Sequence, residues 1–143
     1  MNNPAGFRHC TDIQIRFADI DSMGHVNNAR YLTYIESARI AYFKQVLQTG
    51  MHSSPGFILA KATVDFLLPL LFDDKIQVYT RCSRIGTKSF DLEYEIVKMQ
   101  GNGVITAARA HTVLVAYDYA AQKSIPIPSA WKQIISEFEN KAF

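Results

Sequence analysis

Cysteine, proline and glycine are scarce in this sequence, and long apolar runs are missing. Of 143 residues, two are cysteine, five are proline and seven are glycine. Cys10 and Cys82 are far apart and form no metal-ligand pair, so we expect free thiols in a reducing compartment. No apolar stretch approaches the ~20 residues of a membrane span, and the polar N-terminus does not resemble a secretory signal. These absences predict a cytoplasmic protein.

An excess of one charge is also missing. Fifteen Lys and Arg residues against thirteen Asp and Glu give a net charge of +2, and the basic residues are scattered. This balance argues against a nucleic-acid partner. Because histidines and cysteines do not cluster, we expect neither a metal nor another cofactor. The length suits one domain over residues 1–143, with a loose leader at 1–10.

Apolar periodicity predicts one strand followed by one long helix. Residues 11–18 alternate, with Ile13, Ile15 and Phe17 on one face. After a polar stretch the period changes to that of a helix, which begins near Ala29 after an Asn27 or Asn28 cap and stops near Gly50. Its apolar stripe consists of Tyr31, Ile35, Ala38, Tyr42 and Val46.

The second half of the chain predicts four strands and a short helix. Residues 57–68 are apolar at nearly every position, as in a central strand covered on both faces. The other strands are expected at 75–84, 88–99 and 104–118, with a hairpin turn at 100–103. Residues 129–140 form the short helix, with Ser129 as its cap. The expected fold is α+β, with an antiparallel meander of the last four strands and about five strands in all.

The long helix can bury its stripe only against this sheet, which leaves the other sheet face to explain. Asp91, Glu93 and Glu95 alternate with the core positions of their strand, so part of that face is polar. We expect a partner subunit to cover another part of it.

Acidic, imidazole and amide groups gather in the loop that enters the long helix. Asp21 is the best-placed carboxylate, and Asp19 is interpreted as a turn residue. The helix start exposes unpaired N–H groups and the positive end of the helix dipole, a ready oxyanion site. A nearby carboxylate can act there as a base or a nucleophile. Gly24 would let a bulky group approach the backbone.

The ordered set DxxGHVNNxxYxxYxExAR, from Asp21 to Arg39, closely resembles the hotdog-fold acyl-CoA thioesterases of the 4-hydroxybenzoyl-CoA thioesterase-like group. The runs at 65–76 and 85–90 are similar to that group's second strand and its next hairpin, so the resemblance covers about 11–120. It implies a curved antiparallel sheet around a long central helix, and edge-to-edge pairing of two subunits with the thioester between them.

The resemblance also implies roles for individual residues. Asp21 would act as general base or nucleophile, and the amide around Asn28 would polarise the thioester carbonyl. The related plant acyl-carrier-protein thioesterases have a DxNxHVNN run, in which Asp, Asn and His are held to be catalytic. This chain keeps Asp21 and His25 but has Met23 in place of the asparagine, which favours Asp21 over His25 as the reacting group.

Further residues have a structural interpretation beside a functional one. Substrate contact is a hypothesis for Gly24, Asn27 and Tyr31 around the loop, for Asp65 in its apolar run, and for Lys88 and Ser89 toward the phosphates or pantetheine of coenzyme A. Capping, core packing and a solvated hairpin are the structural alternatives. Glu36 and Arg39, three apart on the helix, are expected to pair.

The sequence therefore predicts an acyl-CoA thioesterase that releases a free acid and coenzyme A. The hotdog hydratases and dehydratases resemble this fold but carry an Asp and a His five apart, or a His with a distant Glu. Asp21 and His25 are four apart, which disfavours that interpretation. A non-catalytic acyl-CoA-binding module is the alternative from another class. Acyl-carrier protein remains open as the thiol carrier, and a homodimer or homotetramer as the assembly.

Overall fold

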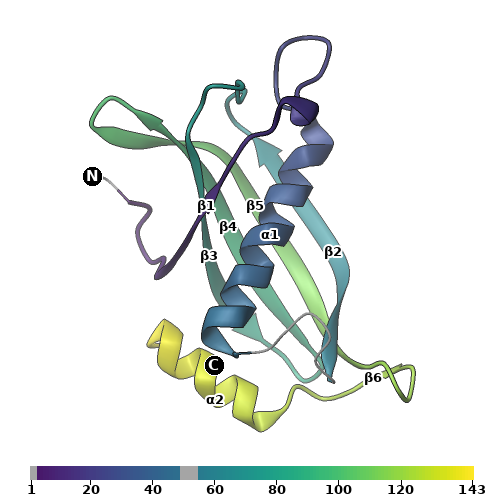
Figure 1. Ribbon diagram of the computed structural model, residues 1–143. Helices are drawn as coiled ribbons and strands as arrows, with labels where there is room; N and C mark the ends of the chain where they lie inside the picture. Colours follow the sequence, from purple (N-terminus) through teal and green to yellow (C-terminus); the bar gives the residue numbers. More distant parts are fainter. Residues whose placement is uncertain (1–2, 49–54) are drawn as a thin grey trace.

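A computed structural model describes residues 3–48 and 55–143, in which a curved sheet wraps one long helix (Figure 1). The α+β class and the antiparallel sheet are confirmed. In chain order the elements are β1 (His9–Ile13), the 3-10 turn η1 (Phe17–Asp19), α1 (Asn28–Val46), β2 (Gly56–Phe66), β3 (Ile76–Ile85), β4 (Ser89–Gln100), β5 (Gly103–Asp118), β6 (Lys123–Ser124) and α2 (Ser129–Glu139).

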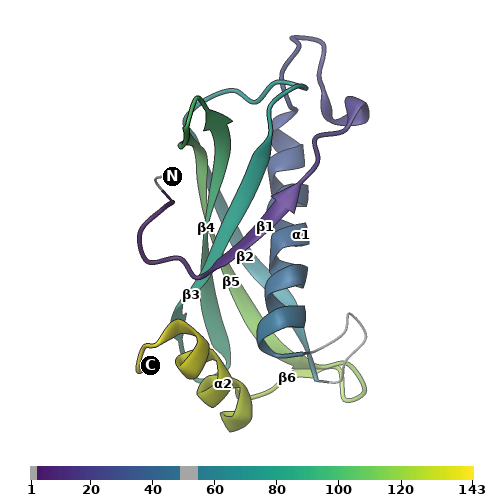
Figure 2. The same cartoon turned by 60° about the vertical axis from the view of Figure 1, so that its left-hand side comes forward.

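Helix α1 lies along the concave face of the sheet, as Figure 2 shows from the side. Its predicted stripe is confirmed, since Tyr31, Ile35, Ala38 and Tyr42 are at most 2 % exposed. The predicted Asn27 cap is also confirmed, because its side-chain oxygen accepts the Ala29 N–H at 2.9 Å. The predicted stop at residue 50 lies outside the described residues. Within those residues, no helix is long and apolar enough to cross a membrane.

The strand order is β1-β3-β4-β5-β2, with β6 on β5. The predicted four-strand meander is therefore wrong: β3, β4 and β5 are consecutive neighbours, but β2 crosses over to pair with β5. For the same reason β2 is an edge strand rather than a central one, and many of its side chains are exposed. Alternation in β4 is as predicted, with Phe90, Leu92, Tyr94 and Ile96 at most 1 % exposed.

The first strand begins and ends earlier than its alternation predicts. His9 and Cys10 already pair with β3, so the expected loose leader is wrong for its last two residues. The chain then leaves the sheet, and Phe17 is 82 % exposed instead of facing the core with Ile15. The cause is local: the Asp19 carboxylate accepts the Arg16 N–H at 3.0 Å and bends the chain into the 3-10 turn.

Helix α2 closes the end of the core that is remote from the start of α1 (Figure 1). An aromatic cluster fills this end. Within it the Phe43 and Phe57 rings stack with centroids 4.1 Å apart, and the Trp131 and Phe57 ring centroids are 4.7 Å apart. The predicted Ser129 cap is wrong. Pro128 occupies the cap position, and Ser129 is the first helical residue.

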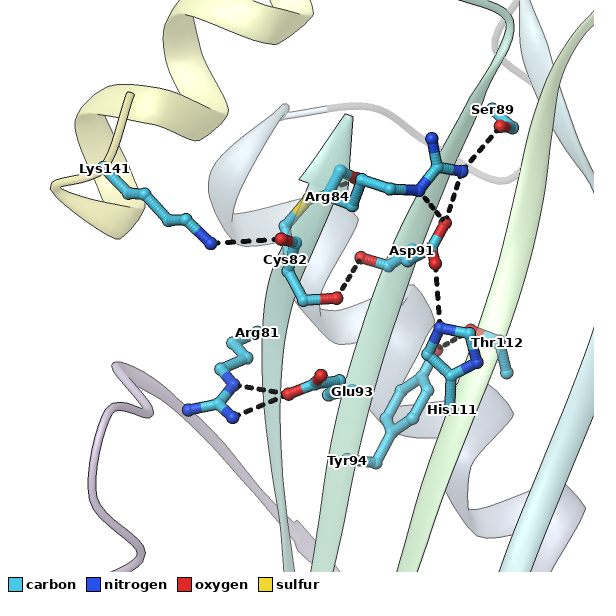
Figure 3. A network of polar contacts seen from close by, with 11 residues as sticks. Arg81, Cys82, Arg84, Ser89, Asp91, Glu93, Tyr94, His111, Thr112 and Lys141 are labelled. Atoms are coloured by element: carbon cyan, nitrogen blue, oxygen red, sulfur yellow. Dashed lines mark hydrogen bonds and ion pairs between the residues drawn. The ribbon is translucent and has the colours of Figure 1, made fainter. Parts of the chain in front are cut away.

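The sheet face turned away from α1 is polar, as predicted from the acidic residues of β4. Asp91 pairs with Arg84 at 2.7 Å and with His111 at 2.9 Å, and Glu93 pairs with Arg81 (Figure 3). Burial by itself raises the pKa of Asp91, but the hydrogen bonds from Arg84 and His111 outweigh it and hold that pKa below its usual value. The acidic row is thus neutralised within the chain.

Candidate active site at the start of helix α1

The loop that carries Asp21 is a small closed structure. Ile20 and Val26 form a bridge, and inside it the Asp21 N–H donates to the His25 carbonyl at 2.8 Å. The Gly24 N–H donates to the Asp21 carbonyl at 3.1 Å, and Gly24 has a φ of +83°, a backbone conformation that suits glycine. The segment DSMGH therefore folds back on itself and returns the chain to the helix start.

The Asp21 carboxylate is held by one oxygen only. Its Oδ1 accepts the N–H groups of Met23 at 2.9 Å and of His25 at 3.3 Å, as in an Asx turn. Its Oδ2 has no hydrogen bond within residues 3–48 and 55–143. The side chain is neither buried nor fully exposed. Asp21 is thus oriented by the loop, with one oxygen left to act on a ligand.

The start of α1 supplies the complementary group. Asn27 satisfies two of the first N–H groups, since its side chain accepts from Ala29 and its carbonyl accepts from Arg30 at 2.8 Å. The Asn28 N–H makes no hydrogen bond in the described part of the chain. It lies at the positive end of the helix dipole, where developing negative charge is stabilised.

These groups border a hollow of about 390 Å³. One wall is the loop and the first turn of α1, and the other is the end of β2 and the segment after it. Tyr31 and Phe66 both line it, and their rings pack edge to face with centroids 4.9 Å apart. Burial raises the pKa of the Tyr31 hydroxyl. The lining residues are Asp21, Met23, His25, Val26, Asn28, Tyr31, Phe66, Leu67, Leu68 and Pro69.

Asp19 is the anchor of this region, and sequence reasoning missed that role. Only 1 % of it is exposed, and its Oδ2 accepts the Tyr34 hydroxyl at 2.7 Å. Its Oδ1 lies 3.2 Å from the Arg16 guanidinium and 3.6 Å from that of Arg30. Its carbonyl accepts the Asn27 N–H at 2.8 Å, which ties the anchor to the helix cap. A buried and saturated carboxylate of this kind positions the loop and cannot reach a substrate.

The structure gathers part of the predicted site. Asp21, His25, Asn28 and Tyr31 line the hollow, whereas Gly24 and Asn27 shape its loop and cap without lining it. The segment of residues 66–69 is a wall that the sequence did not indicate.

Three predicted substrate contacts lie elsewhere in the chain. Asp65 is exposed and borders a hollow on the opposite sheet face, with Arg109 beside it in register. Lys88 and Ser89 lie at the β3–β4 turn, at the other end of the sheet from α1's first turn, where Arg84 binds the Ser89 hydroxyl at 2.9 Å. Within one chain, none of the three can contact a group held by Asp21.

The fold is that of the hotdog class of thioesterases. A solved structure with the same architecture is a thioesterase complexed with coenzyme A and Zn from Thermus thermophilus, with a TM-score of 0.86, 32% identity, and coverage of 98% of this chain and all of that one. The Escherichia coli acyl-CoA thioester hydrolase YbgC is 26% identical over 89% of this chain and 92% of its own length. The E. coli long-chain acyl-CoA thioesterase FadM is 22% identical over 89% of this chain and 96% of its own length.

The family model of the Thioesterase-like superfamily matches residues 15–135. The chain belongs to that superfamily and is a thioester hydrolase. This assignment favours the hydrolase over the hydratase and over the non-catalytic binding module.

Proposed function

We propose that the enzyme hydrolyses acyl-CoA thioesters, with Asp21 as the reacting carboxylate and the Asn28 N–H as the oxyanion donor. The observation that carries the proposal is the pairing, in one hollow, of a carboxylate oxygen and a helix N-terminal amide that both lack a partner in the described part of the chain. Asp21 either takes a proton from the attacking water or attacks the thioester carbonyl itself. Water is consumed, and the free acid and the coenzyme A thiol are released.

The electrostatics of the site support this division of roles. Negative charge develops on the thioester oxygen as the carbonyl carbon becomes tetrahedral, and a fixed amide at a helix start stabilises it without reorganisation. Loss of one such donor typically lowers the rate by ~10²–10³. His25 borders the hollow, and the hydrogen bond that it donates to the Asp21 carboxylate comes from its backbone N–H.

Coenzyme A is the proposed carrier of the acyl group. The names of the relatives support it, since YbgC and FadM are both named for acyl-CoA thioesters, and the T. thermophilus thioesterase structure contains coenzyme A. An acyl-carrier-protein thioesterase from Arabidopsis thaliana is 25% identical over 85% of this chain, so the carrier protein is the alternative to be tested.

A dimer through β2 would complete the site. β2 is an eleven-residue edge strand with exposed apolar side chains, and unpaired edges favour pairing with another chain. Val115 of β5 pairs with Ile58 of β2 on one side and with Ser89 of β4 on the other, so Ile58 and Ser89 lie at the same end of the sheet. Phe66 lies at the other end of β2. Antiparallel pairing about a two-fold axis would bring the Ile58 end of a second copy to the Phe66 end of the first. The second copy's β3–β4 turn, with Lys88, would then lie toward the hollow of Asp21.

The test is thiol release from a panel of acyl-CoA thioesters and from matched acyl-carrier-protein thioesters. Asp21→Asn should retain the fold and lose at least about tenfold in rate, equivalent to ~1.4 kcal/mol of barrier. Asp73→Asn, which changes an exposed carboxylate near the same end of the sheet, is the matched control and should behave as wild type. Retention of most of the activity in Asp21→Asn would rule out Asp21 as base or nucleophile. Binding of acyl-CoA without turnover by wild type would contradict the proposal as a whole.

Sedimentation tests the dimer separately. We expect a species of at least twice 16.2 kDa at micromolar concentration. A stable monomer that is fully active would refute both the pairing through β2 and the contribution of a second copy's Lys88.

A further inference from the structure

A second hollow follows the first along the seam between α1 and β2. It measures about 190 Å³ and is bordered on the sheet side by Leu59 and Ala62. Tyr31 of α1 and Phe66 of β2, which line the hollow of Asp21, come from the same two elements. The helix-side lining of the second hollow consists of Leu32, Thr33, Ile35, Glu36 and Arg39. Arg39 is eight positions after Tyr31 in the helix, a rise of ~12 Å along the helix axis.

Arg39 is unusual in this lining because it is a cation that is largely removed from solvent, with only 9 % of it exposed. Its Nη1 donates to the Tyr94 hydroxyl at 3.5 Å, and that hydroxyl shares a 2.9 Å hydrogen bond with Thr112. The nearest described carboxylate is that of Glu36, at 3.9 Å from Nη2, and the Glu36 side chain is 62 % exposed. The predicted Glu36–Arg39 pair is therefore present but long.

Such an arrangement leaves Arg39 poorly compensated. A guanidinium has five N–H donors, and a buried charge is costly unless it is paired and hydrogen-bonded. The contacts with Tyr94 and Glu36 are both at the limit of useful length. The other groups around this hollow are mostly apolar. A ligand that brings an oxygen into the hollow would supply what Arg39 lacks.

We propose that Arg39 determines substrate specificity by binding an oxygen at the far end of the acyl group, so that the preferred substrates are ω-hydroxy or ω-carboxy acyl thioesters. This inference rests on the proposed function. The thioester carbonyl would lie between Asp21 and the Asn28 amide, and the acyl chain would run along the seam past Tyr31. Apolar side chains would contact its methylenes, and the Arg39 guanidinium would donate to its terminal oxygen. A methyl-ended chain of equal length would bury the same cation without giving it an acceptor.

The experiment compares three thioesters of equal chain length: methyl-ended, ω-hydroxy and ω-carboxy. Each set is measured for chains from hexanoyl to dodecanoyl, with the full-length protein and thiol release as the readout. For wild type we expect kcat/KM to be at least about tenfold higher for an oxygen-ended substrate at the best length, as is typical of a hydrogen bond to a charged group. In Arg39→Met this preference for an oxygen-ended substrate should fall to near unity.

Glu36→Gln distinguishes the two terminal groups. If the preferred end is a carboxylate, removing the Glu36 charge should improve the ω-carboxy substrate selectively. If it is a hydroxyl, the ω-hydroxy substrate should remain preferred, and Glu36→Gln should change its rate little. Arg39→Lys keeps the cation without the planar fork, and should keep part of the preference.

Two results would overturn the inference. The first is a wild-type enzyme that hydrolyses the methyl-ended chain as well as or better than both oxygen-ended chains at every length; this result needs no variant and would leave the proposed function intact. The second is an Arg39→Met enzyme, folded by circular dichroism, that loses rate equally on all three substrates, because that is the effect of a structural arginine. Failure of wild type to hydrolyse any of the thioesters would instead refute the proposed function.

Discussion

Replacing Asp19 with asparagine tests whether this carboxylate is an anchor or a reacting group. An asparagine has one acceptor oxygen, and the best fit turns it toward the Tyr34 hydroxyl and the Arg16 N–H, both of which now contact Oδ2. Its amide then faces the guanidinium groups of Arg16 and Arg30, where Oδ1 now accepts. The variant keeps two hydrogen bonds in weaker, uncharged form and loses the ionic contacts.

The expected cost in free energy of unfolding follows from these contacts. Hydrogen bonds to a charged group are worth about 1.5–3 kcal/mol each. The two arginines are 62 % and 40 % exposed in their side chains, so water compensates them, and their contacts add little. We expect Asp19→Asn to lose about 1.5–3 kcal/mol, measured by urea unfolding with an unchanged m-value. Thioesterase activity of the folded variant should stay within a few-fold of wild type, in contrast to Asp21→Asn.

The pH dependence gives a second measurement of the same contacts. Burial alone would raise the pKa of Asp19, but the hydrogen bonds from the Arg16 backbone and the Tyr34 hydroxyl outweigh it and lower that pKa below 3.8. The resulting stabilisation is fully present above the ordinary value and is lost as the pH falls through the lowered one. The stability gap between wild type and Asp19→Asn should therefore shrink in acid. Equal stability of the two proteins at neutral pH would refute the anchor, and loss of activity without loss of stability would make Asp19 a reacting group.

Three further predictions concern single positions. The Glu139 Oε2 accepts the Cys82 N–H at 2.7 Å, and burial raises the pKa of this carboxyl group. The stability that its protonated form contributes is therefore lost as the pH rises through that pKa. Glu139→Gln should be more stable than wild type at neutral pH and should lose this advantage in acid, as measured by thermal unfolding at a series of pH values. Gly24→Ala should cost about 1–2 kcal/mol in urea unfolding, because the φ of +83° strains alanine although nothing lies within 4 Å of the added carbon. His25→Asn should retain most of the rate, since the hydrogen bond from His25 to the Asp21 carboxylate comes from the backbone N–H; a thousandfold loss, with an ionisation near neutrality vanishing from the pH–rate profile, would show that the ring takes part.

The accuracy of the sequence predictions follows the range of the interactions involved. The α1 stripe and the alternation of β4 depend on neighbours within a few residues, and both are confirmed. Phe17 has the right spacing for a strand, but the Arg16–Asp19 contacts override its alternation. The crossover of β2 to β5 cannot be derived from spacing, because it pairs residues as far apart in sequence as Asp65 and Arg109, with β3 and β4 between them.

The candidate site divides in the same way. Asp21, His25 and the Asn27 cap are close together in sequence, so a local motif could identify them together. The Asp19 anchor depends on Tyr34, fifteen residues away and on another element, and no local pattern connects the two. The wall formed by Leu67 and its neighbours depends on where β2 ends in space, which follows from its pairing with β5.

The wrong prediction of β2 as a central strand and the apolar composition of β2 have the same explanation. Periodicity within one chain cannot distinguish a strand that its own fold buries from an edge strand that another chain would cover. Ile58, Leu59 and Phe66 are 38 %, 45 % and 48 % exposed, unusual values for large apolar side chains along one strand. Phe66 is also part of the wall of the Asp21 hollow, and Leu59 borders the hollow of Arg39. Whatever covers this edge would therefore close both hollows, so that assembly and acyl-group selection would depend on the same strand.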